Sequence, residues 1–246
     1  MSSIIYLLVA QVMPRLLYIW RSSMQPQSDP FIVPPCYDEI KILFQDEHLL
    51  LINKPSGLLS LSGKHPLNKD SVHFRLVQDF PAATLLHRLD FGTSGIMIVA
   101  LNKRINGLIG KQFQEGGVSK TYTAVLHGHV LDDKGFIEFP IAKDVDNFPL
   151  QKICYELGKK ALTNFEVIER LDNPPRTRVL FSPVSGRTHQ LRIHSREIGH
   201  PILGCDLYAT DEAFFMANRL MLHATTIEFI HPVSSEKIKG MCASPF

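Results

Sequence analysis

The chain has few cysteines, and they lie far apart. Its 246 residues contain four, none of which belongs to a Cys-x-x-Cys pair: Cys36, Cys154, Cys205 and Cys242. Zinc knuckles and disulfide frameworks need closely spaced or paired cysteines, so the spacing argues against both and favours a reducing cytoplasm. The metal-like string His127-Gly128-His129 has no third ligand at a recognisable spacing. We therefore expect it to end a strand rather than to bind a metal.

A membrane-spanning run is also lacking. The apolar stretch 4–20 is interrupted by polar residues and a proline, and it is shorter than the ~20 residues that cross a bilayer. It has neither the basic start nor the small-residue cleavage site of a signal peptide. We therefore expect residues 1–30 to be a flexible or spurious extension, with Met24 as the natural start. Residues 31–246 are expected to form the folded domain.

A large excess of one charge is missing as well. The chain carries 26 basic and 24 acidic residues, a net charge of +2. A polyanionic partner would therefore have to be bound by a local basic patch rather than by overall attraction. Segment 187–196 offers such a patch, which four further residues could extend: Lys103, Arg104, Lys111 and Lys120.

Short strands outnumber helices beyond residue 38. Helices are expected over 71–80, capped by Ser71, and over 104–114, ended by two glycines. Strands are expected over 40–44, 48–52, 96–101, 122–127, 136–140, 161–169, 177–182 and 225–230. Many strands in hairpin-like order and few helices indicate an α+β domain on a mixed, mainly antiparallel sheet.

One carboxylate lies where catalytic groups are usually placed. Asp90 stands two residues after Arg88 and just before a Thr-Ser-Gly turn, which leads into the apolar run 96–101. This order predicts an ionised acid on a tight loop at the edge of a rigid sheet. An aspartate that only bonds its own backbone in a turn would give the same pattern.

The basic segment 185–194 contains two arginines and two histidines, and the first acid after it is Glu197. It fits either an alternating strand or a helix, on which Arg192 and Arg196 would share one face. The pattern is typical of a solvated basic helix end. It also suits a phosphate-binding surface that sends one arginine inward to a carboxylate, because a guanidinium can hold such a group with two hydrogen bonds.

Together these segments resemble the RluA-type pseudouridine synthases. The string His-Arg-Leu-Asp-x-x-Thr-Ser-Gly at 87–95 is typical of that family's catalytic loop. Six matching strings occur in the family's order, at 53–58, 87–95, 120–124, 186–192, 199–204 and 222–224. Strings at 151–159 and 218–224 are similar to the branch that acts on large-subunit ribosomal RNA. Because Asn53 already belongs to the catalytic core, no S4-type RNA-binding domain is expected, and the pair Phe91-Gly92 departs from the family pattern.

The resemblance implies an isomerase that turns uridine in RNA into pseudouridine without a cofactor or a metal. It implies that Asp90 is the nucleophile, that Arg192 pairs with it, and that Tyr122 stacks on the uracil and helps to remove the C5 proton. Arg88 would fill the space left by the flipped base. The other expected RNA contacts are His87, Lys54, Arg187, His189 and Arg196. Which atom Asp90 attacks stays open.

The resemblance also implies the partners. The substrates would be a uridine in 23S rRNA and another in a tRNA anticodon stem-loop, bound by a cytoplasmic monomer that contacts neither DNA nor a membrane. Two other functions stay open. One is a catalytically idle RNA-binding protein of the same fold. The other is a nucleoside or glycoside hydrolase, which normally needs a second carboxylate, and the matched strings contain none.

Overall fold

The computed structural model describes residues 32–246, so the expectation about residues 1–30 lies outside the described chain. Ten strands form one sheet: β1 (Lys41–Gln45), β2 (Leu49–Lys54), β3 (Thr84–Leu85), β4 (Ser94–Ala100), β5 (Ser119–His127), β6 (Lys134–Glu138), β9 (Leu162–Leu171), β10 (Arg176–Pro183), β11 (Leu222–Ile230) and β12 (Lys237–Met241). Their order is β1-β2-β4-β11-β5-β10-β9-β6, with β3 beside β4 and β12 beside β11. Only β4 and β11 pair in parallel, so the predicted α+β class with a mixed, mainly antiparallel sheet is confirmed.

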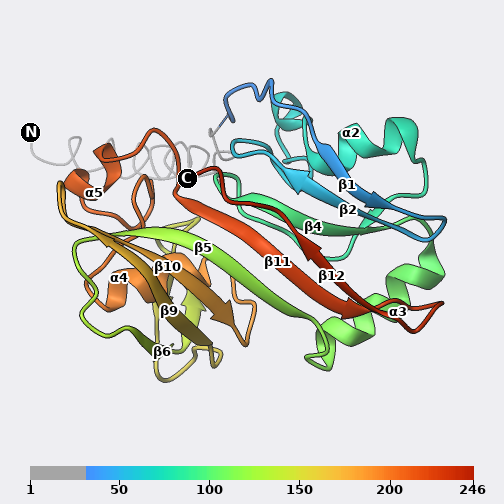
Figure 1. The fold of residues 1–246 in the computed structure, drawn as a ribbon. Helices are drawn as coiled ribbons and strands as arrows, with labels where there is room; N and C mark the ends of the chain where they lie inside the picture. Colours follow the sequence, from blue (N-terminus) through green and yellow to red (C-terminus); the bar gives the residue numbers. More distant parts are fainter. Residues whose placement is uncertain (1–31) are drawn as a thin grey trace, which may run out of the picture.

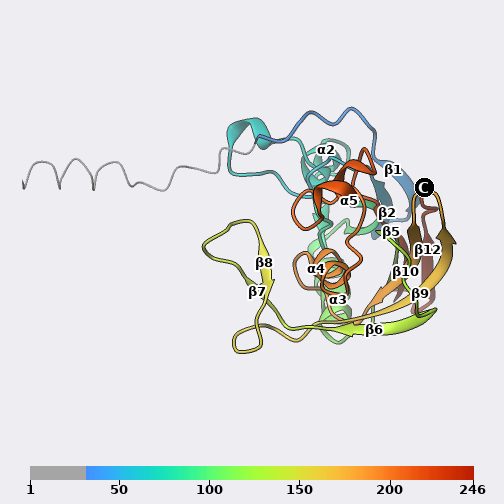
Figure 2. The same cartoon turned by 90° about the vertical axis from the view of Figure 1, so that its left-hand side faces the viewer.

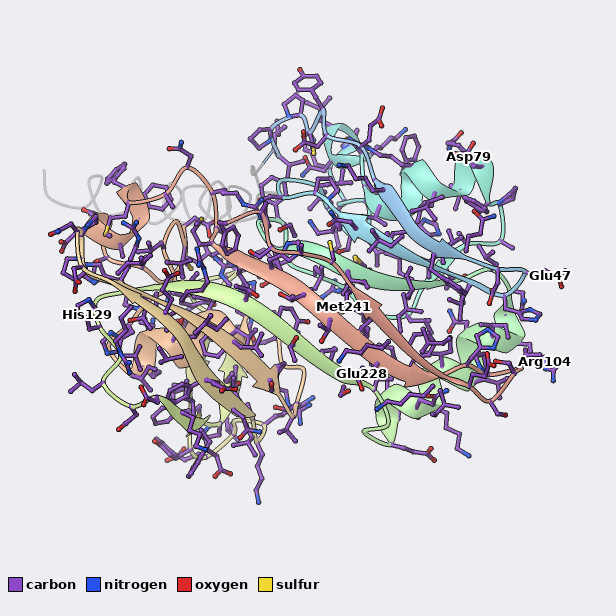
Figure 3. The ribbon with its side chains drawn as sticks, viewed as in Figure 1. Glu47, Asp79, Arg104, His129, Glu228 and Met241 are labelled. Atoms are coloured by element: carbon purple, nitrogen blue, oxygen red, sulfur yellow. The ribbon has the colours of Figure 1, made fainter. Side chains whose placement is uncertain are left out.

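Four α-helices lie on one face of this sheet (Figure 2). They are α2 (Val72–Asp79), α3 (Lys103–Gln114), α4 (Gln190–Glu197) and α5 (Asp211–Phe215), with a 3-10 turn η1 at Pro66–Asn68. A separate hairpin, β7 (Ile141–Lys143) and β8 (Gln151–Ile153), projects on the same side. On the opposite face, Glu228 pairs with Lys237 and Lys239 at 2.8 and 3.2 Å, and Met241 is exposed (Figure 3). No layer of the described chain covers the sheet at Met241.

The predicted elements occur close to their expected bounds. The Ser71 side chain accepts a hydrogen bond from the Phe74 amide and caps α2, and Asn102 caps α3 in the same way. Segment 190–196 is a helix, because Leu191 and Ile193 pack into a hydrophobic core. The prediction missed the short elements β3, β7, β8, β12 and α5, whose two to five residues carry too little periodicity to be recognised.

The apolar interior has two large cores and a third, small one formed by Val125, Leu203 and Ala213. One large core lies where α2 and α3 pack on β2 and β4, and the other large core lies where α4 packs beside β5 and β10. Strand β11 runs between β4 and β5 and contributes to both cores (Figure 1). None of the described helices is long and apolar enough to cross a membrane.

The parallel contact between β4 and β11 depends on Gly95. Its φ is +116°, a conformation that side chains other than hydrogen disfavour. A Cβ there would lie 2.3 Å from the Ala224 carbonyl oxygen on β11. The two halves of the sheet can therefore meet this closely only where β4 has a glycine.

We expect Gly95→Ala to lower the free energy of unfolding by about 3 kcal/mol or more, since strain in φ adds to the clash with backbone atoms. Urea unfolding followed by circular dichroism measures the change. Gly107→Ala in α3 is the matched control, because a Cβ there meets nothing within 4 Å. It should stabilise the protein by about 0.5–1 kcal/mol. Equal stability of the two variants would contradict the role given to Gly95.

Candidate active site

A cleft of about 870 Å³ opens where the loop before β4, strand β5 and the start of α4 converge. Its polar and charged lining includes His87, Arg88, Asp90, Lys120, Tyr122, Arg187, His189 and Arg192. These residues lie up to about a hundred positions apart in the sequence and come from both halves of the sheet. The fold thus brings together all the predicted site residues except Lys54 and Arg196.

The loop that carries Asp90 is held by its backbone carbonyls. The Thr93 amide donates to the Asp90 carbonyl at 3.1 Å and closes the turn. Three groups of segment 54–60 hold the neighbouring carbonyls: the Gly57 amide donates to Phe91 at 2.9 Å, and the hydroxyls of Ser56 and Ser60 donate to Gly92 and Leu89, each at 2.7 Å. Because the backbone is bound in this way, the Asp90 carboxylate is left to face the cleft.

Lys54 belongs to this support, which corrects the prediction that it contacts RNA. Its side chain is fully buried. The ammonium donates to the carbonyls of Pro55, Leu58 and Phe91 at 2.8, 2.7 and 3.2 Å, so all three of its N–H bonds are used inside the protein. Burial lowers the pKa of this amine to about 7.

Arg192 lies between two carboxylates. Its Nη1 is 3.7 Å from Asp90 Oδ2, and its Nη2 is 2.5 Å from Asp206 Oδ1. Its side chain is only 5% exposed, and Nε donates to the sulfur of Cys205 at 3.3 Å. The sequence left open whether the basic segment is a solvated helix end or sends an arginine inward, and the structure shows the inward-pointing arginine. The shorter of its two carboxylate contacts is with Asp206.

Sequence reasoning missed Asp206 and Tyr208. Both follow the matched string 199–204 within four positions, and this proximity was the available signal. The Tyr208 ring lies under both arginines of α4, with its centroid 5.3 Å from Arg192 Cζ and 5.5 Å from Arg196 Cζ. Its hydroxyl lies 2.7 Å from His189 Nδ1, and His189 Nε2 lies 4.0 Å from Asp90 Oδ1.

Tyr122 and His87 line the cleft as uncharged rings. Burial, together with the nearby Asp90 carboxylate, raises the pKa of the Tyr122 phenol above its ordinary value. Burial and the neighbouring Lys120 lower the pKa of His87 to about 3. The Nε2 of His87 accepts a hydrogen bond from the Ile98 amide at 3.1 Å, which ties the loop to β4. His87 therefore has a structural contact and presents an uncharged ring to the cleft, and its contact with RNA stays a prediction.

The remaining predicted contacts lie at or beyond the rim of the cleft. Arg88 and Arg187 are exposed, and Arg187 Nε donates to the Lys160 carbonyl at 3.0 Å. Arg196 does not line the cleft; it pairs with Glu197 at 2.5 Å. In the described part of the chain, no cluster of histidine, cysteine or acidic side chains could hold a metal. His127 and His129 lie instead near Glu212 and Asp172, at 3.6 and 3.5 Å.

The burial of Lys54 predicts a pH dependence of stability. The unfolded chain protonates this amine below about pH 10.5 and the folded chain only below about 7, so stability falls as pH decreases between these values. The contribution amounts to about 2 kcal/mol between pH 9 and pH 7. Urea unfolding of Lys54→Met should show a flatter curve over this window. The exposed Lys64 supplies the control Lys64→Met, which should keep the wild-type slope.

Comparison with known proteins identifies this arrangement. Residues 48–197 match the family described as RNA pseudouridylate synthase. The chain is 47% identical over 205 residues to the dual-specificity RNA pseudouridine synthase RluA of Yersinia pestis, covering 83% of this chain and 99% of that protein. The protein of the same name from Escherichia coli strain K12 is 46% identical over 200 residues, covering 81% and 90%.

A solved structure, human RNA pseudouridylate synthase domain containing 1, superposes with a TM-score of 0.73 at 30% identity, over 87% of this chain and 86% of that one. Human RNA pseudouridylate synthase domain containing 4 has the same fold, with a TM-score of 0.66 at 23% identity over 83% of this chain and 88% of that one. These matches confirm the resemblance predicted from the six strings. The chain therefore belongs to the RNA pseudouridylate synthase family, in its RluA-type branch, and is an isomerase that acts on RNA.

Proposed function

We propose that Asp90 is the nucleophile with which this enzyme opens the glycosidic bond of a uridine flipped into the cleft. The observation that carries the proposal is that Asp90 is the only acid among the cleft-lining residues of the described chain. Arg192 faces one of its carboxylate oxygens and His189 faces the other. A carboxylate with this support can attack the uridine, after which the N1–C1′ bond breaks and a C5–C1′ bond forms. The bond between Asp90 and the substrate breaks again, which returns the carboxylate to its starting state. The C5 proton leaves and N1 gains a proton, so nothing is oxidised and no group is lost.

The same observation argues against a hydrolase. Hydrolysis of a glycosidic bond normally uses a second carboxylate as acid or base, at about 5–10 Å from the first. Asp206 is the second acid near the site, but it is bound to Arg192 at 2.5 Å and does not line the cleft. A catalytically idle RNA-binding protein would have no need to place Asp90, Tyr122 and Arg192 together.

The raised pKa of Tyr122 limits what this residue can do. A phenol that stays protonated is suited to stack on the uracil and to donate a hydrogen bond, and it is a poor base. We therefore assign the Tyr122 ring to holding the base and expect water to take the C5 proton. Arg88, exposed at the rim, is placed to fill the space that the flipped nucleotide leaves.

We further propose that the substrates are 23S rRNA and a tRNA anticodon stem-loop. The support is the dual specificity in the names of the relatives from Yersinia pestis and Escherichia coli. Arg88, Lys120 and Arg187 give the cleft a cationic rim suited to the phosphates of a folded loop. We also propose a cytoplasmic monomer whose residues 31–246 form one catalytic domain. The described cysteines are all free thiols, as a reducing compartment favours.

Removal of the nucleophile should separate binding from turnover. Asp90→Asn should bind RNA within about threefold of the wild type and release no C5 tritium from uridine-labelled transcripts. Wild-type protein and Asp132→Asn, which changes an exposed acid, should release tritium from both RNAs without added metal or cofactor. Carbodiimide-dependent reverse-transcription stops would map the positions. Turnover by Asp90→Asn would show that another group is the nucleophile, and release from one RNA alone would contradict dual specificity.

Arg192 is expected to be irreplaceable by lysine. Arg192 meets Asp90 and Asp206 with two separate nitrogens, Nη1 and Nη2, whereas a lysine has a single nitrogen and cannot reproduce both positions. Arg192→Lys should therefore lose at least about a hundredfold in single-turnover rate, corresponding to roughly 2.7 kcal/mol. Arg196→Lys, on the next turn of α4 and outside the cleft, is the matched control and should remain within about threefold of the wild type.

A further inference from the structure

His189 has a backbone conformation that its helix does not require. It precedes α4 in the left-handed region, with φ 56° and ψ 18°, and its side chain makes no capping hydrogen bond. Such a conformation costs a residue other than glycine about 1–2 kcal/mol. The side chain is only 11% exposed and points into the cleft. The strained backbone therefore serves to aim the imidazole.

The contacts of Tyr208 favour one position for the imidazole proton. The Gln151 amide of β8 donates to the Tyr208 hydroxyl oxygen at 2.9 Å, and His189 Nδ1 lies 2.7 Å from the same oxygen. In the described chain, His189 Nδ1 is the only group positioned to accept the hydroxyl proton. Donation from the hydroxyl to Nδ1 satisfies both groups, and it leaves the proton of a neutral ring on Nε2. Burial, which lowers the pKa of His189, favours that neutral ring.

The protonated Nε2 is the ring atom that faces Asp90. It lies 4.0 Å from Oδ1, while Arg192 Nη1 lies 3.7 Å from Oδ2. Each oxygen of the carboxylate thus has its own donor. Both distances exceed those of good hydrogen bonds, as is common in catalytic sites before the substrate enters, and they can shorten when RNA closes the cleft.

We propose that His189 is a positioning residue for Asp90 rather than an RNA contact. The Tyr208 hydroxyl fixes the ring tautomer, and the ring donates from Nε2 to Oδ1 and holds the carboxylate in its reactive rotamer. The proposal rests on the proposed function, because it takes Asp90 as the nucleophile. Tyr208 supports both donors at once, since its ring also lies under the Arg192 guanidinium.

The tautomer can be observed without any activity. Two-bond ¹H–¹⁵N spectra of the intact labelled protein at pH 7.5 should show His189 as the neutral Nε2–H form. Tyr208→Phe keeps the ring beneath Arg192 but removes the hydroxyl, so it should give a mixture of tautomers. Tyr155→Phe alters an exposed tyrosine and should leave the His189 signals unchanged. A wild-type ring that is cationic or protonated on Nδ1 would overturn the proposal.

Two substitutions of His189 then separate positioning from RNA binding. Asparagine tolerates the left-handed backbone and places its amide near Nδ1, too short to reach Asp90, whereas glutamine places a donor near Nε2. With saturating RNA, His189→Asn should lose at least tenfold in single-turnover rate with RNA affinity within threefold, and His189→Gln should regain most of that rate. Circular dichroism and thermal unfolding check that both variants fold.

The opposite pattern would refute the positioning role. If both variants bind RNA weakly and turn over at the wild-type rate once it saturates, His189 is an RNA contact. Equal losses of rate in the asparagine and glutamine variants would also refute it, because no donor at Nε2 would then be needed. Failure of the proposed function is distinct, since it would appear as turnover by Asp90→Asn, or as wild-type protein that releases no tritium from either RNA.

Discussion

The site depends on the close approach of β4 and β11 at Gly95. This parallel contact joins the two halves of the sheet, each with its own apolar core. Asp90 precedes β4 on one side of the contact, and Tyr122 and Arg192 belong to β5 and α4 on the other. A side chain at Gly95 would separate the strands by meeting the Ala224 carbonyl at 2.3 Å. The distance between Asp90 and its partners is therefore set by a backbone contact outside the cleft.

The charges of the site are arranged so that Asp90 is accessible and faces a fixed guanidinium. Its side chain is 30% exposed, while Arg192 is buried and shared with Asp206. A guanidinium held by a second acid cannot swing away from the site, so one cation stays beside Asp90. The rings of Tyr122 and His87 add surface without charge, because burial shifts the pKa of each toward the neutral form. The exposed guanidinium groups of Arg88 and Arg187 lie at the rim, where a phosphate backbone would pass.

The segment around Lys54 shows how a chemical interpretation of a motif can fail. A lysine in a matched string of an RNA-modifying family suggests a phosphate contact, yet this amine is wholly enclosed by carbonyls. With the hydroxyls of Ser56 and Ser60, it holds the backbone on both sides of Asp90. The string thus supports the loop that carries Asp90, and the buried charge of its lysine is not accessible to RNA. Sequence alone cannot separate the two roles, because both need a donor at the same position.

The sequence by itself determined the family, the α+β class, the capped helices α2 and α3, and the identity of the central residues Asp90, Tyr122 and Arg192. These features depend on local order: hydrophobic periodicity, caps, and residue strings that stand in a recognisable sequence. Tertiary structure alone decided that Arg192 is shared with Asp206, that Lys54 and His87 bind the backbone, and that Tyr208 and His189 form a chain of contacts to Asp90. It also decided the parallel seam at Gly95, since a short string does not show which strand will lie beside it. The physical reason is that the burial and the partners of a polar side chain are set by segments up to 129 positions apart in the sequence. Burial and partners decide whether that side chain binds a ligand, supports the backbone or contributes a charge.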